Sequence, residues 1–232
     1  MADERNRAAA TRLKVWDPWV RLVHWALVVL VPFSWWAAET ERFRLHFLSG
    51  FTILTLVLFR IAWGLVGSET ARFSHFLKGP LAALRHLGHL RDRSAPPEVG
   101  HNAAGGWMVL VLLALLLIQA TAGLFAYDQV MNRGPLARAV SEEWSDRATS
   151  IHLTVFWVIL GCVALHILAV LAYRIIAGRN LVRAMVTGRL DVPAAPAPRA
   201  PRMGHPALAA VLLAAAAGVV YAIASRAPLP ML

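Results

Sequence analysis

The feature that most constrains this chain is a series of five long apolar segments. They cover about residues 20–38, 45–67, 107–127, 150–177 and 206–225. A stretch of about twenty apolar residues is the length that an α-helix needs to cross a hydrocarbon layer of roughly 30 Å. Hydrophobic residues make up 58% of the chain, more than a soluble domain requires. The sequence therefore predicts an all-α integral membrane protein, with a four-helix transmembrane bundle and a fifth, C-terminal transmembrane helix.

The remaining segments predict the domain organisation. Residues 1–19 form an N-terminal tail, residues 20–185 the four-helix domain, residues 186–205 a Pro/Ala linker, and residues 206–225 the fifth helix. Within the four-helix domain, residues 71–93 place apolar and basic side chains at helical spacing, which is typical of an amphipathic helix on a membrane surface. We expect the linker to tether the fifth helix loosely, because Pro-rich segments act as extended spacers.

The distribution of Lys and Arg predicts the orientation in the membrane. Seventeen of these 23 residues lie in the N-terminal tail, between spans two and three, or between spans four and five, each group including residues at the span ends. Cytoplasmic loops carry the excess of positive charge in membrane proteins. We therefore expect a cytoplasmic N-terminus and a C-terminus on the opposite side. The net charge of +10 has the same origin, and no soluble basic domain remains that would bind nucleic acid.

Four of the nine histidines lie in or at the ends of the spans: His24, His46, His152 and His166. Ionisable residues in spans are rare and usually functional. His152 and His166 share one span, and their separation of 14 positions turns a helix to within about 40° of four full turns. They therefore lie on one face, about 21 Å apart along the axis. A single metal ion cannot bind both, because metal–nitrogen bonds are roughly 2 Å long.

Depth gives each of these two histidines a partner. His24 lies level with His166 on the inner side, and His46 lies level with His152 on the outer side. Two such pairs suit the axial positions of two haem irons, whereas zinc usually requires three or four protein ligands. Gly50, one turn after His46, leaves room for a flat macrocycle. The alternative is that each histidine only donates a hydrogen bond between helices. No CxxCH sequence for covalent haem attachment is present.

Four stretches between about residues 14 and 185 match a known pattern: VWDPWVRLVHW, HFLSG, GHNAAGGWMVLVLLALLLIQATAGLF and IHLTVFWVILGCVALH. Together they resemble the bacterial di-haem cytochrome b561 family, which includes the b-type subunits of membrane-bound nickel-iron hydrogenases. The resemblance implies that the four histidines ligate two non-covalent b haems in the bacterial inner membrane. It also implies electron transfer between the quinone pool and a partner, which would be a periplasmic c-type cytochrome, a hydrogenase or a small oxidant such as superoxide. The fifth apolar segment, and GHNAAGG in place of GHNPLGG-like forms, depart from the minimal family pattern.

Several arginines near the histidines are candidates for binding haem propionates, which are anionic. Arg21 lies one turn before the first histidine, and Arg42 and Arg44 flank the outer pair. Arg60 and Arg174 lie near the inner ends of spans two and four. For these two, the positive-inside rule is an equally good explanation.

The functional alternatives follow from these residues. The first is an electron carrier between quinone and a periplasmic partner, which could act as a quinone-linked oxidoreductase. The second is a membrane-anchor cytochrome b subunit of a hydrogenase or other oxidoreductase complex. The third, a proton or metal-ion transporter, is disfavoured because no Asp or Glu lies deep in a span. His101, just before span three, can bind a quinone head group or transfer a proton, or can be an ordinary residue at a helix start.

Overall fold

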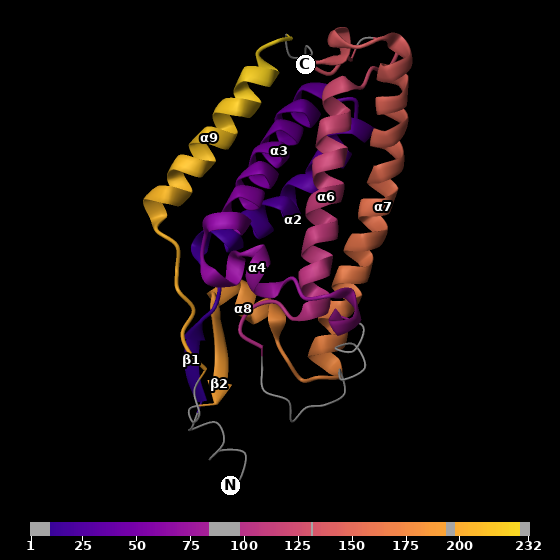
Figure 1. Cartoon of the computed structure of the whole chain (residues 1–232). Helices are drawn as coiled ribbons and strands as arrows, with labels where there is room; N and C mark the ends of the chain where they lie inside the picture. Colours follow the sequence, from indigo (N-terminus) through magenta and orange to yellow (C-terminus); the bar gives the residue numbers. More distant parts are fainter. Residues whose placement is uncertain (1–9, 84–97, 131, 194–197, 228–232) are drawn as a thin grey trace.

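The computed structural model of the chain describes residues 10–83, 98–130, 132–193 and 198–227. Its long helices are α2 (Pro18–Glu39), α3 (Phe43–Val66), α6 (Ala103–Phe125), α7 (Glu142–Ile175) and α9 (Pro206–Ala224) (Figure 1). Each of the five is long and apolar enough to cross a membrane. The predicted all-α membrane bundle is therefore confirmed. The shorter elements are β1 (Ala10–Lys14), η1 (Glu69–Ala71), α4 (Phe73–Phe76), η2 (Ala137–Ala139), α8 (Leu181–Thr187) and β2 (Arg189–Pro193).

The two ends of the bundle differ in what covers them. One end carries β1, β2, α4 and α8 and is called here the strand end; the other carries the turn between α2 and α3 and the connection between α6 and α7, and is called the loop end (Figure 1). Both α3 and α7 run from the loop end to the strand end. This shared direction fixes which of their residues lie at the same depth.

Helix α7 is longer than its apolar part. Ser141 caps the helix by accepting a hydrogen bond from the backbone N–H of Trp144 at 3.4 Å, and Glu142 and Glu143 occupy the first turn. A capping hydroxyl and early acidic residues favour a helix start, because they satisfy free N–H groups and the helix dipole. The helix thus begins before the apolar residues do, and His152 lies inside a continuous helix.

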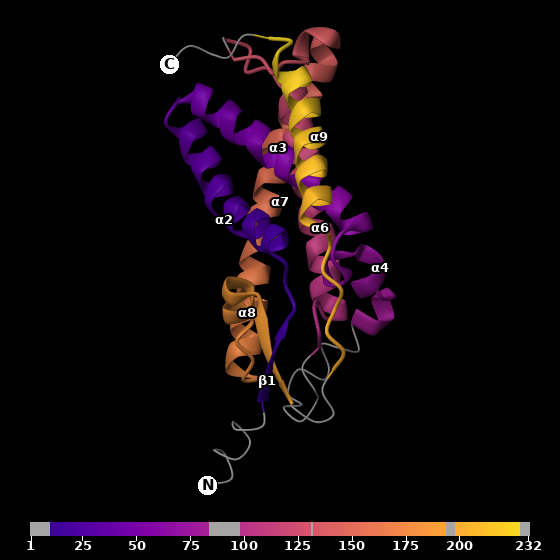
Figure 2. The same ribbon diagram turned by 90° about the vertical axis from the view of Figure 1, so that its left-hand side faces the viewer.

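The fifth long helix packs against the bundle. Helix α9 contacts α3, and Figures 1 and 2 show the two helices alongside each other. Ala209 and Ala216 of α9 are buried in one apolar cluster with Phe59 and Trp63 of α3. Small side chains allow such close approach between helices in a membrane. Helix α9 is therefore part of the folded core.

The expectation of a loose linker is wrong, because the linker is bound at two places. Strand β2 pairs antiparallel with β1 from the N-terminal tail. Further along, Arg199 forms an ion pair with Glu69 at 2.5 Å, and the backbone N–H of Arg202 donates to the same carboxylate at 2.9 Å. The hydrogen bond from Arg202 is the largest cause that lowers the pKa of Glu69. These contacts join segments far apart in the sequence, which a Pro-rich composition does not indicate.

The segment predicted as one amphipathic helix is interrupted where the structure describes it. Helix α4 ends at Phe76, residues 77–79 are not helical, and residues 80–83 are helical again. Pro80 explains the break, because proline disfavours a helical conformation in the residue before it. Residues 84–93 of the predicted helix lie outside the described residues.

Asp17 fixes the strand end of α2. Its side chain is 3% exposed, and Oδ1 accepts hydrogen bonds from the backbone N–H groups of Trp19 and Val20, both at 2.9 Å. Oδ2 accepts a hydrogen bond from the indole Nε1 of Trp63 on α3 at 3.1 Å. One carboxylate therefore caps α2 and joins it to α3, which sets the position of the helix that carries His24.

Replacing Asp17 with Ala is expected to lower the stability of the fold. The loss of a helix cap costs about 0.5–2 kcal/mol, and the buried indole N–H of Trp63 left without an acceptor costs about 1–3 kcal/mol more. The unfolding temperature in detergent, followed by circular dichroism, measures the loss. Ser141→Ala is the matched control, because that cap accepts a single long hydrogen bond at an exposed helix start. An equal effect of the two substitutions would contradict this role of Asp17.

Candidate functional site

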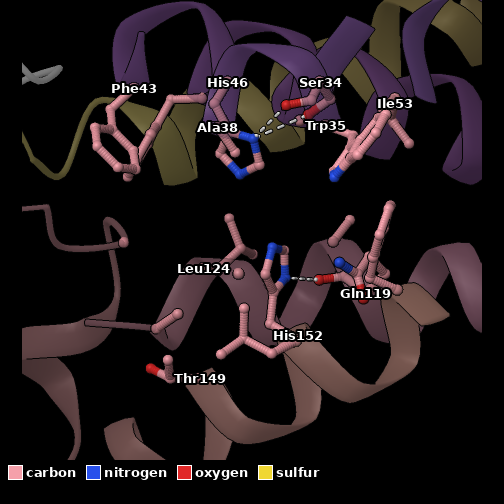
Figure 3. A pocket seen from close by; sticks show the side chains of 18 of the residues that line it. Ser34, Trp35, Ala38, Phe43, His46, Ile53, Gln119, Leu124, Thr149 and His152 are labelled. Carbon is pink, nitrogen blue, oxygen red and sulfur yellow. Dashed lines mark hydrogen bonds between the residues drawn. The ribbon is translucent and has the colours of Figure 1, made fainter. Parts of the chain in front are cut away.

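At the loop end, His46 of α3 and His152 of α7 face each other (Figure 3). Their ring centres are 5.9 Å apart and the ring planes are inclined by 85°. Two metal–nitrogen bonds of about 2 Å each, together with the distance from each ring centre to its own nitrogen, span such a separation. The two rings are therefore spaced to hold one metal atom between them.

Both of these rings are held by hydrogen bonds at Nδ1. The Nδ1 of His46 donates to the backbone carbonyl of Ser34 at 2.9 Å, and the Nδ1 of His152 donates to the carbonyl of Gln119 at 2.8 Å (Figure 3). The hydroxyl of Ser34 lies 3.2 Å from the same nitrogen of His46. A carbonyl only accepts, so Nδ1 carries the proton in both rings. Nε2 is then left with the free lone pair that a metal requires.

A cavity of about 350 Å³ lies around this pair and is lined by residues of α2, α3, α6 and α7. Gly50 lines it, and a Cβ atom added there would meet no atom within 4 Å. Gly123 of α6 also lines it, and a Cβ atom there would lie 3.0 Å from Cε1 of His152. One glycine therefore leaves the cavity open, and the other leaves room for the histidine ring.

At the strand end, His24 of α2 faces His166 of α7. The ring centres are 6.4 Å apart with a 60° angle between the planes, so this pair is also spaced for one metal atom. The Nδ1 of His24 is buried, and it has no hydrogen-bond partner in the part of the chain that the structure describes. Helix α7 thus carries one histidine of each pair, and the structure brings together the pairs that depth predicts.

The number of ligands favours haem over a protein-only metal site. Within the described ranges, no group of three His, Cys, Asp or Glu residues is placed to hold a metal ion. Zinc needs three or four protein ligands. A haem iron takes its remaining ligands from the porphyrin, so two histidines on opposite sides suffice. The free Nε2 atoms, the ring spacing and the open face at Gly50 fit a haem.

Three of the arginines predicted to bind haem propionates differ in their surroundings. The Nε of Arg21 donates to the backbone carbonyl of Met185 at 3.2 Å, and its guanidinium also donates to the carbonyl of Val186. Arg21 therefore binds the carbonyl groups near the end of α8, where a cation is favourable. Arg42 and Arg44 are exposed, and neither is among the residues that line the loop-end cavity.

His101 lies just before α6, near the strand-end pair. Its ring packs between those of Trp16 and Phe76, with ring centres 4.6 Å apart in each case. Its Nδ1 is buried and lacks a hydrogen-bond partner among the described residues. Burial, which is the largest cause, and the charge of Arg60 together lower the pKa of His101 to about 3. His101 is therefore a neutral ring at pH 7.

Sequence analysis missed three contributors to the loop-end site: Ser34, Gln119 and Gly123. The first two act through backbone carbonyl groups, which every residue type has. Gln119 and Gly123 lie four residues apart and so share one face of α6. The sequence therefore indicates that the two residues share a helix face, but that this face borders His152 follows only from the packing of α6 against α7.

Comparison with curated proteins and with solved structures finds no match. A sequence profile of the family described as prokaryotic cytochrome b561 matches residues 15–188. The matched range covers well over half of the chain and contains all four histidines. Membership implies a multi-pass membrane protein that binds b haem and transfers electrons. The chain therefore belongs to the prokaryotic cytochrome b561 family.

Proposed function

We propose that the protein is a di-haem cytochrome that carries electrons between the quinone pool and a periplasmic redox partner in a bacterial inner membrane. One haem b binds between His46 and His152, and the other between His24 and His166. The observation that carries this proposal is the pair of ring-centre distances, 5.9 and 6.4 Å, at two separate levels of one bundle. A single site would need only one such pair.

The protein contributes ligation, orientation and spacing, and the bound haem supplies the one-electron chemistry of iron. The Nε2 atoms of the four histidines would hold the two haem irons. At the loop end, the carbonyl groups of Ser34 and Gln119 hold the ring planes and strengthen the imidazoles as donors. Along α7, His152 and His166 are separated by about 21 Å, a spacing that supports two sites near opposite faces of the membrane.

The Lys and Arg bias supports a cytoplasmic strand end and a periplasmic loop end. The loop-end pair then lies next to the periplasm, where a c-type cytochrome, a hydrogenase or a small oxidant is the redox partner. The strand-end pair lies next to the cytoplasmic leaflet. We place the quinone there because His101 offers a neutral, buried ring nitrogen beside that pair.

The test is the haem content and reducibility of the purified full chain. We expect two haems per chain, a b-type spectrum on reduction, and reduction of both haems by a short-chain ubiquinol or menaquinol. Haem extraction with pyridine measures the ratio, and a protein assay gives the number of chains. A folded protein with one haem or none would refute the di-haem proposal.

A further inference from the structure

Arg60 is a buried cation in the apolar helix α3. Its residue is 4% exposed. Nη1 donates to the backbone carbonyl of Ala71 at 3.2 Å, and the guanidinium lies 5.6 Å from the ring centre of Phe73. Nη2 is buried and has no hydrogen-bond partner among the described residues. A buried charge is costly unless an opposite charge and hydrogen bonds compensate it. This guanidinium therefore requires an acceptor for Nη2 and a negative charge nearby.

No carboxylate in the described part of the chain forms an ion pair with Arg60. Asp17 attracts it at longer range. The oxygens of Asp17, however, already accept hydrogen bonds from the backbone of α2 and from the indole of Trp63. Asp17 is therefore engaged in holding the helices together, and it leaves Nη2 of Arg60 without an acceptor.

Helix periodicity places Arg60 at the depth of the strand-end pair. His46 and Arg60 are 14 residues apart on α3, as His152 and His166 are on α7. Both helices run from the loop end to the strand end, and His46 faces His152. Fourteen residues advance a helix by about 21 Å and bring it within about 40° of four full turns. Arg60 therefore lies level with His166, on the face of α3 that carries His46.

His101 gives independent evidence that Arg60 borders the strand-end pair. Arg60 lies near the ring of Phe73, Phe73 contacts Phe76, and Phe76 packs against the ring of His101. The next residue, Asn102, donates a hydrogen bond to the hydroxyl of Tyr173 on α7 at 2.7 Å, about two turns beyond His166. His101 itself is neutral and supplies no negative charge. Among the described residues, the carboxylate that attracts Arg60 is Asp17, whose oxygens already accept other hydrogen bonds, so the buried Nη2 of Arg60 can still take an anionic acceptor.

We propose that Arg60 binds a propionate of the haem held by His24 and His166. The inference rests on the proposed function, because it requires a haem at this pair. A guanidinium and a carboxylate form strong charge-assisted hydrogen bonds, and the unpartnered Nη2 is the donor available for them. Helix α3 then serves both haems. It gives an iron ligand to the loop-end haem through His46 and a propionate partner to the strand-end haem through Arg60.

This assignment predicts a specific effect on one reduction potential. Reduction of Fe(III) to Fe(II) by one electron removes one positive charge from the haem, so a nearby cation favours the reduced form. Arg60→Gln removes that cation. The midpoint potential of the strand-end haem should fall, and that of the loop-end haem should stay unchanged. Arg60→Lys keeps the charge but loses the planar fork, so its potential should fall less.

The measurement is a redox titration of the absorption spectrum of the full chain, with dithionite as reductant. The strand-end haem is identified as the component that His166→Ala lacks. Arg174→Gln is the comparison, because Arg174 is the other inner arginine predicted as a propionate partner, but it is exposed at the strand end of α7. A fall in the strand-end potential alone, smaller in Arg60→Lys and absent in Arg174→Gln, supports the proposal. Arg60→Lys also serves as the test if Arg60→Gln does not fold.

Three results would overturn the proposal. The first is unchanged potentials with lower thermal stability, which would make Arg60 purely structural. The second is unchanged potentials with a raised KM for quinol, which would place Arg60 at the quinone. The third is an equal effect of Arg174→Gln, which would reduce Arg60 to general surface charge. If the wild-type protein does not bind two haems, the proposed function is wrong. The number of haems per chain shows this independently of the Arg60 variants.

Discussion

Replacing His152 with Ala is expected to remove the loop-end haem and to leave the strand-end haem bound. The substitution removes one of the two histidines that we propose hold this haem. The two pairs are about 21 Å apart along α7, and sites separated by more than about 10 Å usually respond independently. The haem content should fall from two per chain to one. His166→Ala should give the complementary protein, which lacks the strand-end haem.

Difference spectra of the two variants test which histidine pair holds which haem, because each variant should retain the spectral component that the other has lost. His75→Ala is the control, since His75 is an exposed residue of α4 outside both pairs. It should keep both haems. If His152→Ala and His166→Ala lost the same component, the pairing by depth would be wrong. If each lost both haems while the helix content stayed unchanged, the two sites would depend on each other.

Much of the candidate site could be predicted from sequence because its main pattern is local to one helix. The 14-residue spacing of His152 and His166 fixes a shared face and an axial separation without any tertiary information. The alternation of spans then gives the depth of His24 and His46. Apolar segment length predicts the spans themselves, because the thickness of the membrane sets it.

The parts that sequence did not predict depend on contacts between distant segments. Arg21 lies one turn before His24 in the sequence. Its guanidinium nevertheless donates to the carbonyl groups of Met185 and Val186, which are far along the chain. The carbonyl that orients His152 belongs to Gln119 on another helix. The pairing of β1 with β2 is of the same kind. Backbone acceptors and long-range pairing have no residue-type signal, so they become visible only once the helices are packed.

Arg60 is a residue whose type is visible in the sequence but whose role is not. In the sequence it is one of several basic residues near the strand end, and a positive charge at the end of a span needs no further explanation. Arg60 is buried, and its Nη2 has no hydrogen-bond partner in the described ranges of the chain, whereas Arg174 is exposed. The repeat of the 14-residue spacing on α3 acquires meaning only because His46 is seen to face His152.

Inserting one alanine after Leu160, between the two histidines of α7, is expected to abolish one of the two haems. One extra residue rotates the following part of a helix by about 100° and shifts it by about 1.5 Å. His152 and His166 then no longer share a face. Ile159 is buried against Leu113 and Leu116 of α6, and the carbonyl of Gln119 holds His152.

These contacts hold the loop-end half of α7 in place, so the rotation should fall on His166 and the strand-end haem should be lost. Electron transfer from quinol to a periplasmic acceptor should then stop, although the loop-end haem still reduces with dithionite. An alanine inserted after Arg179, beyond the C-terminal end of α7, moves neither histidine relative to the other and should leave both haems bound. Retention of both haems after the Leu160 insertion would mean that α7 absorbs the extra residue as a π-bulge. The rigid spacing of the two ligands would then not be what separates the haems.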